Sequence, residues 1–220
     1  ATAEAADAGP APLPENLPAV AGLNPSVRIA MALKGLDYTY IPVHLQRKEQ
    51  FNESYTAVSA SRLVPTLRED DGTLLTQSLA IVEYLDETHP EPALLPKDPV
   101  GRARVRALAL DIACEIHPIN NLRVLGYLTG TLKVSEDDKN RWYRHWVETG
   151  LAALERQLVG HPSTGRFCHG DTPTLADITL VPQIFNAKRF ECRLDHVPEV
   201  MRIFGNCMAL DAFAQSQPSA

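Results

Sequence analysis

Four prolines within ten residues, Pro90, Pro92, Pro96 and Pro99, divide this chain into two parts with different hydrophobic patterns. Proline donates no backbone hydrogen bond and clashes with a preceding helical turn, so such a cluster is typical of a linker. Before it, β-branched runs alternate with helical segments, whereas after it apolar residues recur at helical spacing. A chain of 220 residues can hold two small domains. The sequence therefore predicts an α/β domain followed by an all-helical domain.

The α/β domain is expected over residues 23–90. Asn24 can cap the first helix and Pro25 suits its first position, while Gly35 ends it. Ser78 is expected to cap a second helix that ends before His89-Pro90. Between these helices the pattern predicts strands at Tyr38–Val43, Leu63–Arg68 and Thr73–Thr76, a short helix near Phe51–Ala57, and a hairpin turn at Asp70-Asp71-Gly72.

Residues 1–22 form a leader rich in alanine and proline, which predicts extended or disordered chain. The best strand candidate in it, Leu17–Val20, contains Pro18. Because proline is poorly tolerated inside a sheet, no strand is predicted before the first helix.

The helical domain is expected over residues 91–220. A helix from Arg102 to about Leu128 should be kinked at Pro118. Glu136–Leu158 has the apolar spacing of another helix. Thr174 and Asp177 form a capping box that opens a helix to about Phe190, and a last helix follows Pro198.

Charge and composition exclude several classes of function. The formal net charge of −6 does not favour nucleic acid or an anionic membrane as a partner. No apolar run approaches the roughly 18 residues of a membrane span, and the acidic start does not resemble a signal or transit peptide. The four cysteines are scattered without metal-ligand spacing, so reduced thiols, no metal and a cytoplasmic location are expected.

Several motifs give the chain a specific resemblance. Over roughly residues 27 to 217 it resembles the zeta class of glutathione transferases, the maleylacetoacetate and maleylpyruvate isomerases. The His-Pro-Ile-Asn-Asn run is the motif most specific to that class, whereas the Val-Pro and Gln-Ser pairs are shared by many transferase classes. The motifs are Lys34–Tyr38, Leu63–Leu67, Leu75–Ile81, His117–Leu125, Gly170–Asp177 and Val181-Pro182-Gln183.

The resemblance implies a glutathione-transferase fold, in which a thioredoxin-like domain binds glutathione and a helical domain binds substrate. It implies glutathione-dependent cis–trans isomerisation of an unsaturated diketo acid, maleylacetoacetate or maleylpyruvate, by a homodimer. Conjugation or dehalogenation of another electrophile on the same fold is one alternative. A non-catalytic binding protein with this fold is another.

The resemblance also implies which residues hold glutathione. A cis bond between Val64 and Pro65 would present the Val64 backbone to the cysteinyl part. Gln77, Ser78 and the helix N-terminus would hold the γ-glutamyl carboxylate, since exposed N–H groups and the helix dipole favour an anion. The structural alternatives are a proline at a strand start and simple capping by Ser78.

The remaining candidates lie in the helical domain. The resemblance places His117 and Asn121 near glutathione, and Asn120 and Arg123 near the substrate. Alternatively, the His117–Asn121 segment is a polar network that repairs backbone bonds broken by Pro118. Arg189 would meet a substrate carboxylate, which suits a bidentate guanidinium, although a cation is also favourable at a helix C-terminus.

The chain departs from the family where a serine should activate the glutathione thiol. Counted back without gaps, Ala21 and Gly22 stand at the expected serine positions. A free thiol has a pKa near about 8.5, so some activator must lower it. Asn24, Ser26 or the bare helix N-terminus are the candidates. An altered or misplaced start of the chain is the other explanation for this departure.

Overall fold

A four-stranded sheet organises the N-terminal domain. The computed structural model describes residues 19–22 and 25–216. Within them the strands follow the order β2-β1-β3-β4, with β1 parallel to β2 and antiparallel to β3, and β4 antiparallel to β3. The strands are β1 (Ala19–Ala21), β2 (Thr39–Ile41), β3 (Thr66–Arg68) and β4 (Leu74–Thr76).

The prediction that no strand precedes the first helix was wrong. Ala19–Ala21 forms β1, an inner strand that pairs with both β2 and β3. All three residues are buried, and Val20 is completely inaccessible to solvent. A run of only three residues carries little pattern of its own, so pairing on both sides decides its conformation. Residues 19–21 of the predicted leader therefore belong to the sheet, while Pro18 and the residues before it lie outside the described chain.

Helices cover the sheet and connect its strands. Residue Lys34 at the end of α1 (Pro25–Lys34) is buried, and its ammonium group donates to Asp86 at 2.7 Å and to the carbonyls of His89 and Pro92. These bonds tie α1 to α3 and to the interdomain linker. The other elements are η1 (Leu45–Arg47), η2 (Glu49–Phe51), α2 (Glu53–Thr56) and α3 (Ser78–Thr88).

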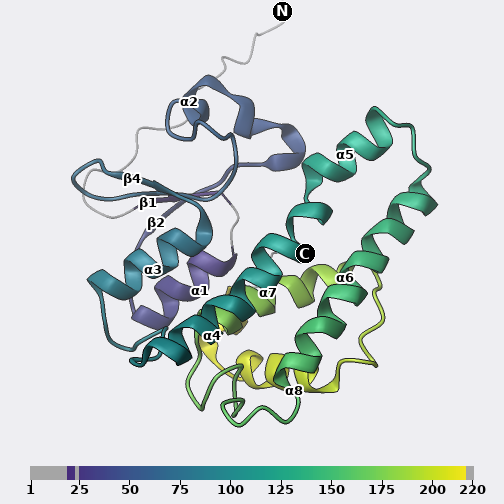
Figure 1. Ribbon diagram of the computed structural model, residues 1–220. Helices are drawn as coiled ribbons and strands as arrows, with labels where there is room; N and C mark the ends of the chain where they lie inside the picture. The colour runs from purple at the N-terminus through teal and green to yellow at the C-terminus, as the bar shows by residue number, and fades with distance from the viewer. Residues whose placement is uncertain (1–18, 23–24, 217–220) are drawn as a thin grey trace, which may run out of the picture.

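The second domain is built from helices alone within the described residues, and Figure 1 shows α5 and α6 rising beside the N-terminal domain. The helix predicted from Arg102 to Leu128 is instead broken into four pieces, because the backbone widens into a π-helical turn before Pro118. The elements are α4 (Pro99–Leu110), the π-helical η3 (Asp111–Ile116), η4 (Pro118–Asn120), α5 (Leu122–Gly130), α6 (Glu136–Leu158), α7 (Leu175–Arg189), α8 (Pro198–Met208) and α9 (Asp211–Ala214).

The predicted capping box opens α7. Asp177 is fully buried and accepts hydrogen bonds from the Thr174 backbone at 2.8 Å and the Cys168 backbone at 2.9 Å. The Leu175 amide also donates to the carbonyl of Leu94 in the linker. These bonds fix the start of α7 against both the loop before it and the junction between domains. In the described part of the chain, no helix is long and apolar enough to cross a membrane.

Candidate functional site

The register of the sheet brings three chain segments to one edge. Thr66 at the start of β3 pairs with Ala21 at the end of β1 and with Thr76 at the end of β4. Continued by one residue, this register places Gly22, Pro65 and Gln77 side by side. The N-terminus of α1, the Val64-Pro65 pair and the N-terminus of α3 therefore converge, and we call them the sheet-edge cluster.

The Val64-Pro65 peptide is cis, as the resemblance predicts. Val64 packs directly against Gly22, the residue after β1. Gly22 has a φ of +90°, and a Cβ added to it would lie 2.3 Å from Val64 Cγ1. Only glycine fits both the backbone conformation and the space. Position 22, where the resemblance implies a serine, is therefore closed to any larger side chain in this conformation.

The N-terminus of α3 differs from the expectation. Ser78 does not cap the helix: it is the first helical residue, and Gln77 occupies the cap position without a side-chain bond. Gln77 has φ 71° and ψ 115°, an unfavourable region for a residue with a side chain. Strained backbone of this kind clusters at binding sites.

No side chain in the described part of the chain accepts from the first N–H groups of α3, whereas Asp98 and Ser135 cap α4 and α6. The first turn of a helix has amide hydrogens without intrahelical partners, and the helix dipole adds positive potential there. The start of α3 therefore suits an anionic group such as a carboxylate.

Of the two side chains predicted to activate the thiol, the structure describes only Ser26. Ser26 lies in the first turn of α1, is 8% exposed, and its hydroxyl forms no hydrogen bond with another described residue. Asn24 lies outside the described residues.

The predicted helical-domain residues lie on the segment between α4 and α5. His117 follows the π-helical turn and is exposed, yet desolvation by surrounding protein lowers its pKa. Both observations fit a residue in a recess. Asn120 is 7% exposed, and both polar atoms of its side chain lack hydrogen-bond partners among the described residues. An unpaired buried amide is costly and calls for a partner that the described residues do not provide.

Asn121 combines two possible roles. Its side chain caps α5 by accepting from the Arg123 amide at 3.2 Å. This bond supports the structural alternative for Asn121, and it leaves the side-chain amide hydrogens available to a ligand.

Arg123 points away from the core of its own domain. Leu125 is the buried residue of α5, and at about 100° per residue Arg123 and Tyr127 lie on the side opposite to it. Both are exposed, Tyr127 by 57%, and the side chain of Arg123 forms no hydrogen bond or ion pair with another described residue. Sequence reasoning missed Tyr127, although its spacing of four residues from Arg123 indicates a shared helix face.

Arg189 is the last residue of α7 and is exposed. Burial raises the pKa of Tyr143 strongly, and the charge of Arg189 opposes that shift, so the two groups are neighbours. The residue before Tyr143, Trp142, donates to the Ile119 carbonyl at 3.1 Å. Trp142 and Tyr143, neighbours on α6, therefore lie beside the segment that contains Asn120 and near Arg189, respectively.

His117, Asn120, Asn121, Arg123 and Arg189 form the helical-domain cluster. Among the described residues, no hydrogen bond or ion pair joins it to the sheet-edge cluster. Figure 1 shows α5 on the side of the helical domain that is turned toward the N-terminal domain. In the described residues, no group of three His, Cys, Asp or Glu side chains is placed to hold a metal ion.

Comparison with known families matches both domains. Residues 26–93 match the family described as Glutathione S-transferase, N-terminal domain, and residues 141–197 match Glutathione S-transferase, C-terminal domain. A Vibrio cholerae protein named "Probable maleylacetoacetate isomerase" is 48% identical over 195 residues, which cover 87% of this chain and 89% of the relative. "Maleylpyruvate isomerase" of Ralstonia sp is 44% identical over 199 residues, covering 90% of this chain and 93% of the relative.

Solved structures agree with these relatives. The holo structure of a maleyl pyruvate isomerase, described as a bacterial glutathione S-transferase in the zeta class, has a TM-score of 0.87 at 42% identity and covers 90% of this chain and 95% of its own. A maleylacetoacetate isomerase of Anaeromyxobacter dehalogenans 2CP-1, with GSH bound in its active site, has a TM-score of 0.81 at 43% identity, covering 91% and 94%.

Proposed function

This chain belongs to the glutathione S-transferase family, in its zeta-class branch of maleylacetoacetate and maleylpyruvate isomerases, and we propose that it catalyses glutathione-dependent cis–trans isomerisation of one of these diketo acids. The observation that carries the proposal is the convergence of the α1 start, the cis Val64-Pro65 pair and the uncapped α3 start at one sheet edge.

The sheet-edge cluster fits glutathione at its anionic end. The uncapped N–H groups of α3, together with Ser78 and Gln77, would hold a carboxylate, and the Val64 backbone would align the peptide part. When bound, glutathione supplies a nucleophilic thiol that adds reversibly to the cis double bond, so that rotation can follow.

The helical-domain cluster would hold the substrate. Arg123 and Arg189 offer guanidinium groups for the carboxylates of a dianionic diketo acid. The unpaired amide of Asn120 can hydrogen-bond the developing enolate oxygen, and Asn121 and His117 can orient the bound peptide. Positioning of the two reactants and stabilisation of negative charge are thus the protein's contributions.

The proposal is tested by the glutathione-dependent isomerisation of maleylacetone or maleylpyruvate, followed by ultraviolet absorbance. We expect a rate well above that of free glutathione, with no rate when glutathione is omitted. A folded sample that binds glutathione without turnover would reject catalysis. It would favour a non-catalytic binding protein, which the closed position at Gly22 also supports.

Replacing Ser26 by Ala is expected to lower kcat about tenfold, because one hydrogen bond to a thiolate would be lost. The fold should be unaffected, since the hydroxyl bonds to no other described residue. Ser61→Ala, at an exposed site, is the control. An unchanged rate in both Ser26→Ala and the Ser26→Ala/Asn24→Ala double variant would remove side-chain activation and leave the helix N-terminus as activator.

We also propose that the protein is a homodimer. Val100, Ala103, Ala107 and Leu110 form an exposed apolar stripe along α4, in which Val100 is 80% and Leu110 44% exposed. A stripe of this length on one helix face is typical of an interface, and a second copy of the chain is its natural partner.

Leu110→Glu is expected to convert the dimer to a monomer, because a carboxylate would be desolvated at the centre of the contact. Light scattering coupled to gel filtration measures the mass. The control Tyr127→Glu changes an exposed residue of another helix and should leave the mass unchanged. A monomeric wild type at micromolar concentration would contradict the proposal.

We propose a cytoplasmic location as well, supported by four cysteines that remain free thiols. Fractionation of cells that produce the full-length protein tests it. Recovery in a secreted or membrane fraction would contradict this assignment.

A further inference from the structure

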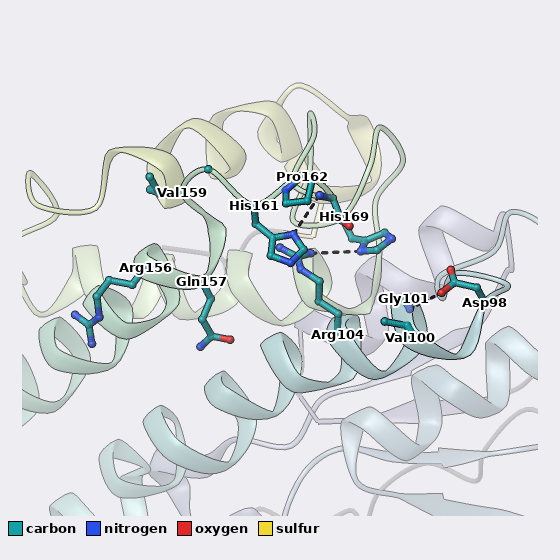
Figure 2. Close-up of a pocket in the computed structure, with 12 residues that line it drawn as sticks. Asp98, Val100, Gly101, Arg104, Arg156, Gln157, Val159, His161, Pro162 and His169 are labelled. Atoms are coloured by element: carbon teal, nitrogen blue, oxygen red, sulfur yellow. Dashed lines mark hydrogen bonds between the residues drawn. The ribbon is translucent and has the colours of Figure 1, made fainter.

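A cavity lies in the helical domain, outside both clusters described above. It has a volume of about 670 Å³ and lies between the N-terminal end of α4 and the loop that joins α6 to α7. Figure 2 shows Arg104 rising from α4 toward His161 and His169 of that loop. None of the residues lining it belongs to the proposed isomerase site.

Arg104 is held by neutral groups only. Its guanidinium donates to the Cys168 carbonyl at 2.7 Å and to the Thr164 hydroxyl at 2.9 Å, with His169 Nδ1 at 3.3 Å. Arg106, Arg144, Arg193 and Arg202 each pair with a glutamate, whereas no ion pair within the described residues includes Arg104. Desolvation lowers the pKa of Arg104, and the charges of Cys168 and Asp177 oppose this shift, although neither forms an ion pair with the guanidinium. A further anion close to the guanidinium would stabilise this partly buried charge.

The two histidines have defined tautomers. The Ser163 amide donates to His161 Nδ1 at 3.1 Å, and Arg104, which can only donate, bonds to His169 Nδ1. In each neutral imidazole the proton therefore lies on Nε2, which is left as a donor. The pKa of His169 is lowered by desolvation and then by the charge of Arg104, with a smaller effect of His161, while Asp98 and Asp177 oppose the shift. His169 is therefore close to Arg104 and His161 and also to two carboxylates.

Two other charged residues line the cavity. Asp98 accepts from the Gly101 amide at 2.7 Å, and its charge opposes the positive groups at His169. Arg156 is exposed and adds positive charge at the other side. The charge at the mouth therefore favours an anion, and Asp98 weakens that preference.

We propose that this cavity binds a small oxyanion of the phosphate type. Arg104 and Arg156 supply positive charge, and His161 donates through Nε2–H, while Nδ1 of His169 helps to hold the Arg104 guanidinium in place. Charge-assisted hydrogen bonds of this kind are about twice as strong as neutral ones, and the oxyanion would provide the ion pair that Arg104 does not form with any described residue.

The test is a titration of the full-length protein with inorganic phosphate at constant ionic strength, followed by NMR of the histidine side chains. We expect saturable shifts of the His161 and His169 resonances, with no saturable shift of exposed His145 on α6. His161→Gln should weaken phosphate binding at least about tenfold, as loss of a hydrogen bond to a charged group implies.

Asp98→Asn should change the affinity for phosphate in the opposite direction. Asparagine can still accept from the Gly101 amide, but it removes the opposing charge, so phosphate should bind about two- to fivefold more tightly. Arg104 is left intact because it also holds the loop through Cys168 and Thr164. Absent or non-saturable shifts, equal shifts at His145, or changes of the same sign in both variants would overturn the proposal.

Discussion

Replacing Gly22 by Ser, which restores the residue type expected from the family, should destabilise the protein and impair its activity. A side chain at this position meets Val64 at 2.3 Å, and the φ of +90° is strained for any residue but glycine. The backbone strain and the forced displacement of Val64 together should lower the free energy of unfolding by about 3 kcal/mol. Urea unfolding measures this difference as a lower midpoint.

The control Gly35→Ala separates the two causes of destabilisation, backbone strain and the contact with Val64. Gly35 also has a positive φ, of +65°, but an added Cβ there meets nothing within 4 Å. It should therefore cost about 1 kcal/mol, from backbone strain alone. The excess in Gly22→Ser measures the contact with Val64, and glutathione affinity should fall only in that variant. A Gly22→Ser protein with unchanged stability and a faster isomerisation rate would show that the turn accepts a serine by another conformation.

The elements with their own periodicity could be predicted from the sequence. The helix Glu136–Leu158 begins and ends at the predicted residues, because its capping serine and its apolar spacing are both local. The Thr174–Asp177 box is likewise a local signal, and it is present in the structure. The Asp70-Asp71-Gly72 turn joins β3 and β4 as expected.

What the sequence could not indicate depends on contacts distant in the chain. β1 is a strand because β2 and β3 flank it, and no pattern of three residues encodes that pairing. Ser78 has a capping side chain, but the left-handed φ of Gln77 shifts the helix start by one residue. Similarly, the unpaired amide of Asn120 and the contact between Gly22 and Val64 exist only once the chain is folded.

The proposed substrate carboxylate contact makes Arg123 the residue with the largest expected effect on turnover. Arg123→Met should lower kcat/KM for the diketo acid about thirty- to a hundredfold, because a charge-assisted and bidentate contact would be lost. Arg123→Lys keeps the charge but not the planar fork, so it should recover only part of the rate.

The fold should tolerate both substitutions. The Arg123 side chain is exposed, and Asn121 caps α5 through the backbone amide of residue 123, which every variant retains. Arg141→Met is the matched control, since Arg141 is exposed and pairs only with Asp138 on the same helix. Steady-state kinetics with glutathione and substrate varied separately will show whether the loss of kcat/KM comes from weaker binding of the diketo acid or of glutathione.

A fall in glutathione affinity with unchanged substrate KM would show that Arg123 binds glutathione and not the substrate.

The Arg123→Met/Arg189→Met double variant extends the test. If both guanidinium groups hold one substrate, their effects should not be additive, because the first loss already releases the ligand from its position. Additive effects would place the two arginines on independent steps, and Arg189 would then be explained by its place at the end of α7 beside Tyr143.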